Sequence, residues 1–177
     1  MDQQIANSMI PAWQNGTLTP VEKLQVHHEG LRHMAVSVFV MQEDRILIQR
    51  RALGKYHTPG LWANTCCTHP HWGEAPIDCA ARRLNEELGI TGLDLTYREQ
   101  VEYRADVGGG MIEHEQVDIF TAFAGLDLSV RPNPSEVMDT DWVTRDALSA
   151  RIAEQPAAFT PWMRIYIAEH SKLIFGA

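Results

Sequence analysis

The segment GEAPIDCAARRLNEELGI, residues 73–90, constrains the fold more than any other part of the chain. Pro76 opens and Gly89 closes a stretch whose apolar residues recur at helical spacing, which predicts a helix from Pro76 to Gly89. The apolar positions are Ile77, Ala80 or Ala81, Leu84 and Leu88. Away from that stripe the helix is charged, with Arg83 one turn before Glu87 and with Glu86 beside it. Taken alone, this pattern is that of a solvated face stabilised by an ion pair four residues apart.

The register of these charges favours a second interpretation. Counted back from the glycine, the spacing resembles the Nudix box, a loop–helix–loop that holds magnesium against a diphosphate. The matching residues are Glu74, Arg82, Glu86, Glu87, Gly89 and Ile90. The resemblance implies a Nudix fold.

Two positions depart from the box. Thr68 stands where the box opens with glycine, and Arg83 stands where the hydrolases carry a metal-binding glutamate. A hydrolase of this kind needs several metal ions to activate water, and a cation in place of a carboxylate weakens the binding of those ions. We therefore expect a Nudix-like fold with a changed chemistry.

The remaining hydrophobic patterns mix strands and helices without strict alternation. An apolar run at residues 34–41 followed by RILIQR at 45–50 predicts a hairpin. Residues 93–104 predict one or two strands, residues 113–125 another strand, and residues 144–155 and 161–175 two helices. We expect an α+β fold, a Nudix-like α/β/α sandwich with a mixed sheet, formed by residues 1–177 as a single domain.

The charge pattern narrows the kind of ligand. A net charge of −8 argues against nucleic acid, whose phosphates need a basic footprint. The basic residues are nevertheless bunched, as in Arg50, Arg51 and Lys55, which suits a small anionic ligand. No apolar run is long enough to cross a bilayer, and no signal peptide is evident at the start, so we expect a cytoplasmic protein.

Cysteine and histidine gather in NTCCTHPHWGE, residues 64–74. An odd count of three cysteines, two of them adjacent, predicts free thiols rather than a structural disulfide. A zinc clip from Cys66, Cys67, His69 and His71 is one alternative, although it lacks the Cys-x₂-Cys spacing. Cys79, on the predicted helix, is interpreted as a buried apolar filler.

The surrounding chain resembles the type I isopentenyl-diphosphate isomerases. The blocks that carry the resemblance are RRALGKYHTPGLWANTCCTHPHWGE, YRADVGGGMIEHE, SEVMDTDW and FTPWM. They occur in the family's order from about Lys23 to Trp162, and the resemblance covers about residues 23–172. It implies an enzyme that interconverts isopentenyl and dimethylallyl diphosphate by protonation and deprotonation.

The resemblance also implies the acid and the base. Cys67 corresponds to the family's acid/base cysteine, although threonine follows it where the family has glycine. Glu115 is its partner, and Tyr103 is a candidate helper at that carboxylate. Trp162 corresponds to the ring that faces the carbocation, with Trp62 as a second aromatic candidate. Which proton step belongs to the thiol and which to the carboxylate stays open.

A metal site of three histidines and two glutamates is implied as well. Glu113 and Glu115 lie two apart in a predicted strand, so both project from one face while His114 points away. Carried over, the ligands are His27 or His28, then His33, His69, Glu113 and Glu115. The spacing after Lys23 favours His27. Nitrogen and oxygen ligands suit manganese, zinc or magnesium.

A second ion, Mg²⁺, is implied between Glu87 and the substrate's diphosphate. The basic residues that correspond to the family's diphosphate ligands are Lys23, Arg51, Lys55 and Arg83. The remaining histidines, His57, His71, His114 and His170, are expected to be ordinary surface or core residues.

Two other functions are compatible with parts of the pattern. One is a Nudix pyrophosphohydrolase of a nucleotide or prenyl diphosphate, which Thr68 and Arg83 disfavour. The other is a non-enzymatic metal-binding or regulatory module. The expected partner is a small prenyl diphosphate, and the expected oligomeric state is a monomer or weak dimer.

Overall fold

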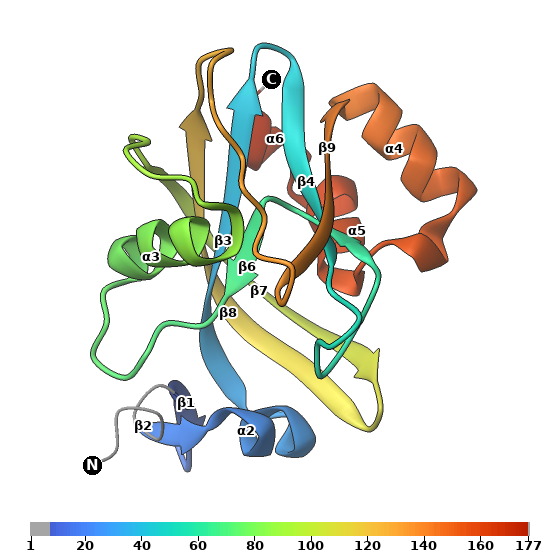
Figure 1. Cartoon of the computed structure of the whole chain (residues 1–177). Coiled ribbons are helices and arrows are strands. Elements are labelled where there is room, and N and C mark those ends of the chain that lie inside the picture. The colour runs from blue at the N-terminus through green and yellow to red at the C-terminus, as the bar shows by residue number, and fades with distance from the viewer. Residues whose placement is uncertain (1–7, 177) are drawn as a thin grey trace.

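A computed structural model describes residues 8–176 and contains a nine-stranded mixed sheet between two layers of helices (Figure 1). Residues 1–7 and Ala177, which the predicted domain includes, lie outside the described residues. The strands are β1 (Met9–Gln14), β2 (Thr17–Glu22), β3 (Arg32–Gln42), β4 (Arg45–Arg51), β5 (Trp62–Ala63), β6 (Cys66–Thr68), β7 (Thr96–Gly108), β8 (Met111–Phe123) and β9 (Val137–Thr144). The helices are α2 (Lys23–Glu29), α3 (Pro76–Leu88), α4 (Arg145–Glu154), α5 (Pro161–Glu169) and α6 (Ser171–Phe175), with a 3₁₀ turn at Pro156–Ala158.

Strand β3 is the centre of the sheet. It pairs in parallel with β8 from Arg32↔His114 to Met41↔Phe123, and antiparallel with β6 through Ser37↔Cys67. It also bridges β1 at Ala12↔His33. It also pairs briefly with β4. One strand thus fixes the relative positions of four others.

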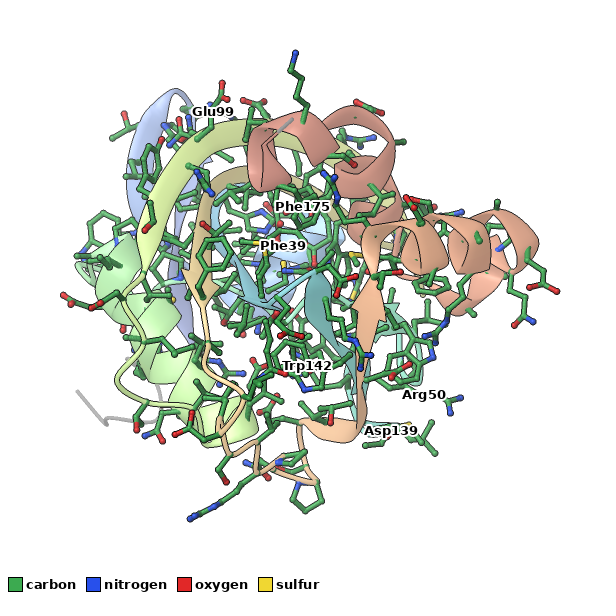
Figure 2. The ribbon with its side chains drawn as sticks, turned by 90° about the horizontal axis from the view of Figure 1, so that it is seen from above. Phe39, Arg50, Glu99, Asp139, Trp142 and Phe175 are labelled. Atoms are coloured by element: carbon green, nitrogen blue, oxygen red, sulfur yellow. The ribbon has the colours of Figure 1, made fainter. Side chains whose placement is uncertain are left out.

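Side chains alternate between the two faces of β3, and each face has its own core. Val36, Val38 and Val40 pack toward α3 with Leu84 and Leu88 of that helix. Ala35 and Phe39 pack on the other side with residues of α4, α5 and α6. Figure 2 shows Phe39 beside Phe175, and their rings meet edge to face at 5.5 Å. The predicted α/β/α sandwich is confirmed.

Helix α3 begins and ends where the sequence predicts. Pro76 occupies its first turn, and Gly89 closes it in the left-handed conformation at φ 64°, its N–H bonded to the carbonyl of Asn85. The interpretation of the charged face as solvated is wrong for Glu87, which is only 4% exposed. Glu86 is exposed, so these adjacent glutamates belong to different environments.

The strand and helix predictions need three corrections. The predicted hairpin pairs only at its tip, Met41↔Ile46 and Gln42↔Arg45, because β3 continues along β8 while β4 turns away to pair with β9. The predicted helix at residues 161–175 is two helices, interrupted at His170. The elements β1, β2, α2, β5, β6 and β9 were not predicted. Most of them are too short to show a hydrophobic period, and β9 shows no regular alternation of buried and exposed residues.

Within the described residues, no helix is long and apolar enough to span a membrane.

The end of α3 generates a stability prediction. Replacing Gly89 with alanine puts a Cβ in the left-handed region and 3.0 Å from the Arg131 Cβ. We expect Gly89→Ala to lower the free energy of unfolding by about 2–3 kcal/mol, of which about 1–2 kcal/mol is backbone strain. Gly92→Ala is the matched control, because Gly92 has a similar φ of 74° but open space around it. Equal losses for the two variants in urea unfolding would contradict the role of the Arg131 contact.

Candidate active site

A narrow pocket of about 20 Å³ opens at the end of the sheet where β3 and β8 begin and β6 ends. Its wall contains many of the residues singled out from the sequence: Lys23, Arg51, Lys55, Cys67, His69, Arg83, Glu113, Glu115 and Trp162. Tyr56, His57 and Thr68 complete it. Cations, carboxylates, a thiol and an aromatic ring therefore meet in one small space.

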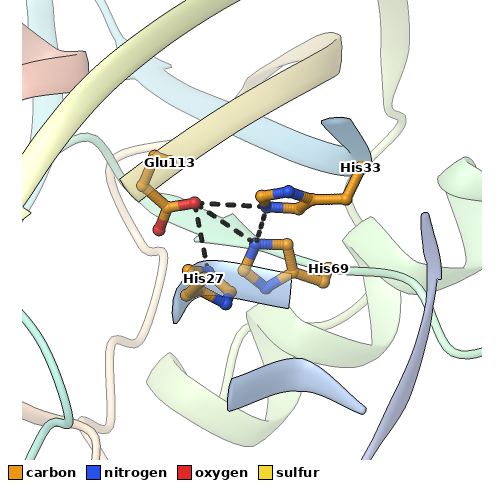
Figure 3. A group of neighbouring side chains, drawn as sticks. All are labelled: His27, His33, His69 and Glu113. Atoms are coloured by element: carbon orange, nitrogen blue, oxygen red, sulfur yellow. Dashed lines mark hydrogen bonds and ion pairs between the residues drawn. The ribbon is translucent and has the colours of Figure 1, made fainter. Parts of the chain in front are cut away.

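Three buried histidines converge on one oxygen of a buried glutamate (Figure 3). The Nε2 atoms of His27, His33 and His69 and the Oε2 atom of Glu113 all lie within 4.8 Å of one another. Oε2 is 3.1 Å from His27 Nε2 and 3.2 Å from His33 Nε2. His28 is exposed on the far side of α2, so the geometry brings His27, not His28, into this cluster.

Glu115 borders the cluster and connects it to the pocket. Its Oε1 atom lies 2.9 Å from His69 Nε2 and 3.7 Å from His33 Nε2. Its Oε2 atom accepts a 2.5 Å hydrogen bond from the Tyr103 hydroxyl. His114 points to the opposite face, where it meets Glu102. The alternation expected for this strand is therefore present.

The electrostatics of the cluster call for a cation. Glu113 and Glu115 are 2% and 1% exposed, and buried carboxylates are costly without compensating positive charge. Burial alone lowers the pKa of His33, but its hydrogen bonds to the two glutamates outweigh burial and raise that pKa to about 10.

The donor set also fits a divalent ion. The Nε2 atoms of His33 and His69 are only 3.2 Å apart, so they face each other across a point that both can ligate. The Nδ1 atom of His33 contacts the Leu31 carbonyl at 2.8 Å, and that of His27 contacts the Lys23 carbonyl at 2.6 Å. When each ring is neutral, these contacts place its proton on Nδ1 and leave Nε2 available for a metal. The cluster can therefore hold a divalent metal ion.

The thiol of Cys67 faces the same pocket as Glu115. Cys67 is opposite Ser37 in the β3–β6 ladder, and Glu115 is opposite His33 in the β3–β8 ladder, so one face of β3 carries both. The Ser37 hydroxyl lies 3.3 Å from Cys67 Sγ and 2.9 Å from the Tyr166 hydroxyl. Burial, and then the negative charge of Glu115, raise the pKa of Cys67 well above its usual range, which keeps the thiol protonated.

The second cysteine has a different environment. Cys66 alternates to the α3 side of the sheet, where it is fully buried beside Cys79. His71 is partly exposed and lies near Glu74. The alternative zinc clip from Cys66, Cys67, His69 and His71 is therefore not formed.

Four cations, Lys23, Arg51, Lys55 and Arg83, line the pocket. Burial, followed by repulsion from Lys55 and Arg83, lowers the pKa of Lys23 to about 8. Glu136 partly neutralises the group, 2.5 Å from Lys55 Nζ and 3.3 Å from Arg83. The repulsion among these four cations is relieved when a polyanion binds to them.

Trp162 lines the pocket, whereas Glu87 does not. Glu87 lies behind Arg83, 2.5 Å from its guanidinium, and accepts a hydrogen bond from Gln49 rather than lining the pocket. The Trp162 ring forms part of the wall, with the Arg51 guanidinium 5.4 Å from its centroid. Trp62 is outside the pocket wall and stacks with Arg151.

Sequence reasoning missed several residues of this site. Ser37 and Tyr166 sit in stretches interpreted only as strand and helix, and no local pattern marks a serine that will face a cysteine thirty residues away. Glu136 and His57 had a signal, since both belong to blocks that carry the family resemblance. His57 was expected to be an ordinary histidine, but it lines the pocket and contacts Glu113.

Comparison with known families agrees with this geometry. The NUDIX domain family matches residues 31–163. A Deinococcus radiodurans protein, DR0079, superposes with a TM-score of 0.72 at 16% identity, covering 94% of this chain and 98% of that one. A MutT NUDIX hydrolase from Burkholderia pseudomallei gives 0.61 at 22% identity, covering 78% and 98%. The fold and the family match define a Nudix protein.

Sequence relatives narrow the assignment within that class. An isopentenyl-diphosphate Delta-isomerase of Cereibacter sphaeroides (strain ATCC 17025 / ATH 2.4.3) is 64% identical over 168 residues, 95% of each chain. Proteins with the same name from Dinoroseobacter shibae and Rhodobacter capsulatus are 62% and 59% identical, covering 95% and 97% of this chain and 96% and 97% of theirs. The chain belongs to the isopentenyl-diphosphate Delta-isomerase family.

The cations that line the pocket generate a binding prediction. Arg83 lines the pocket, whereas its neighbour Arg82 is paired with Glu74 outside it. We expect Arg83→Gln to weaken the binding of inorganic pyrophosphate about 10- to 100-fold, the loss of one charge-assisted contact. Calorimetric titration with Mg²⁺ present measures this affinity. Arg82→Gln should bind pyrophosphate with an affinity within about threefold of that of the parent protein. An equal loss of affinity in both variants would show that the effect comes from the change in net charge and not from a direct contact of Arg83 with the ligand.

Proposed function

We propose that this chain interconverts isopentenyl diphosphate and dimethylallyl diphosphate, and that the pocket described above is where it does so. The family membership supports the isomerase activity. The observation that carries the site assignment is that a partly buried thiol and a buried carboxylate, Cys67 and Glu115, open onto one pocket that is also lined by cations.

The reaction requires a proton to be added at one carbon and removed from another. Cys67 and Glu115 are the proposed acid and base, because both line the pocket, Glu115 almost fully buried and Cys67 partly buried. The raised pKa of the thiol, caused by burial and by Glu115, favours a resting state with the proton on sulfur. Glu115 is held by Tyr103 at one oxygen and by His69 at the other, which fixes the direction of its lone pairs.

The intermediate between the two proton steps is a tertiary carbocation or a species close to it. Water must be excluded from it, and the pocket wall is largely buried. The Trp162 ring is the proposed stabiliser of the positive charge. Its indole N–H is buried and makes no hydrogen bond to any described residue. The ring therefore contributes through its aromatic face and its volume, and not through a hydrogen bond.

The diphosphate is proposed to bind Lys23, Arg51, Lys55 and Arg83, the four cations that line the pocket. Binding energy gained there positions the alkene, which has no polar group to recognise.

Two metal ions are proposed. His27, His33, His69 and Glu113, with Glu115 alongside, would hold a Mn²⁺, Zn²⁺ or Mg²⁺ ion, which supplies a fixed positive charge that tunes the acidity of Glu115. Glu87 would hold a Mg²⁺ ion together with the substrate's diphosphate. In the present arrangement Arg83 covers Glu87, so this second role requires the arginine to turn toward the diphosphate.

The pyrophosphohydrolase alternative is not favoured. The relatives that match the whole chain carry the isomerase name, and the hydrolase likeness is limited to the fold at 22% identity or less. Arg83 forms ion pairs at the position where a hydrolase needs a metal-binding carboxylate. A cytoplasmic location, a single domain over residues 1–177 and a monomer or weak dimer remain predictions.

The test is incubation with isopentenyl diphosphate in deuterated water, followed by NMR. We expect deuterium in the methyl groups of dimethylallyl diphosphate, and we expect turnover to stop when a chelator removes the metal. Cys67→Ala should fold normally and lose at least about 10³-fold in turnover, because it removes one member of the acid/base pair.

Cys66→Ala is the matched control, since Cys66 is the adjacent thiol on the other face of the sheet. It should retain most of the turnover. Substantial turnover by Cys67→Ala would remove that residue from the mechanism, and release of phosphate without isomerised product would remove the isomerase proposal itself.

A further inference from the structure

A fourth histidine contacts the glutamate at the centre of the proposed metal site. His57, on the loop between β4 and β5, is 4% exposed, and its Nε2 atom lies 2.8 Å from Glu113 Oε1. Only the other oxygen, Oε2, faces His27, His33 and His69. Figure 3 shows the dashed lines to the three histidines leaving one oxygen of Glu113, while the second oxygen carries none. The two oxygens therefore have different partners.

The hydrogen bonding of His57 defines which nitrogen carries its proton. Nδ1 lies 3.0 Å from the Thr58 hydroxyl, which can donate to it. A bare Nε2 would set its lone pair against the carboxylate oxygen at 2.8 Å, which is repulsive, whereas an Nε2–H is attracted. The ring N–H is directed away from the straight line to Oε1, so the contact is a close electrostatic one rather than a linear hydrogen bond.

The loop holds the ring of His57 in place from several sides. Its edge meets Tyr56 at 4.2 Å and Trp162 at 5.8 Å between ring centroids. The Arg51 guanidinium donates to the His57 carbonyl at 3.1 Å. Thr58 has a left-handed φ of 45°, an unfavourable conformation for a β-branched residue that persists only where the surroundings enforce it. A ring held in this way can hold the Glu113 carboxylate in one orientation.

We propose that His57 is a positioning residue of the metal centre: it occupies Glu113 Oε1, so that the carboxylate presents the single oxygen Oε2 to an ion bound by His27, His33 and His69. Without that contact the carboxylate is free to rotate about its terminal bond. Binding of the ion must then also fix the carboxylate in one orientation, and the entropy lost in doing so lowers the affinity for the ion. Partners of metal ligands that act in this way change metal affinity by about 10- to 100-fold when they are removed. This inference rests on the metal site of the proposed function.

Two substitutions of similar size distinguish the contact from simple packing. The side-chain amide of His57→Gln places an N–H near the position of Nε2, whereas that of His57→Asn reaches only the position of Nδ1. We expect the metal-free protein carrying His57→Asn to bind Mn²⁺ or Co²⁺ about 10- to 100-fold more weakly than the parent, and His57→Gln to recover most of the loss. His114→Asn, on the exposed face of β8 between the two glutamates, should bind as the parent does.

The affinities are measured by competition with a chromophoric chelator, without substrate, and thermal unfolding of the metal-free variants checks that each is folded. This readout is independent of turnover, so it can fail while the isomerase activity stands, and it can succeed if the activity is absent. Unchanged affinity in His57→Asn would overturn the proposal, as would equal losses in both His57 variants. A Co²⁺ absorption spectrum that loses a nitrogen ligand in His57→Gln would also overturn it, because His57 would then bind the ion directly. An unchanged spectrum supports it.

Discussion

The structure depends on one strand, β3. The registers of its pairing with β8 and with β6 determine which residues of those two strands lie beside its pocket-side residues. Parallel pairing with β8 sets Glu115 opposite His33, and antiparallel pairing with β6 sets Cys67 opposite Ser37. Because side chains alternate with a period of two, a slip of one residue in either ladder would turn the glutamate or the thiol into the core under α3. The proposed acid and base are thus positioned by backbone hydrogen bonds, not by flexible loops.

The same strand places a costly concentration of charge at its start. Two carboxylates that are almost fully buried lie among four histidines, and this cluster is stable only if positive charge is shared with it. A protonated His33 can supply that charge in part, and a divalent ion at the common focus of the Nε2 atoms supplies it more completely. The cations that line the pocket have the opposite need, since Lys23 and its neighbours repel one another until an anion binds. A metal ion and a diphosphate would each complete an electrostatic balance that the polypeptide leaves open.

Much of this arrangement could be predicted from the sequence, but only where a local pattern existed. The limits of α3, the alternation of Glu113 and Glu115 and the sandwich class follow from periodicity and capping residues. Pairing between distant segments does not, which is why the parallel β3–β8 ladder and the Ser37–Tyr166 hydrogen bond were not foreseen. Assignment of Cys67, rather than Cys66, needed the family resemblance. The structure supplies the physical reason: strand alternation directs adjacent thiols to opposite faces.

The central claim is that an ion, a carboxylate and a thiol surround one hydrocarbon slot that ends in a diphosphate clamp. The most direct measurement is anomalous X-ray diffraction at the manganese edge, from crystals grown with Mn²⁺ and a substrate analogue. The account predicts a manganese peak among His27, His33, His69 and Glu113, with the analogue's tail between Cys67 and Glu115. A peak elsewhere, or a tail bound away from that thiol, would contradict it.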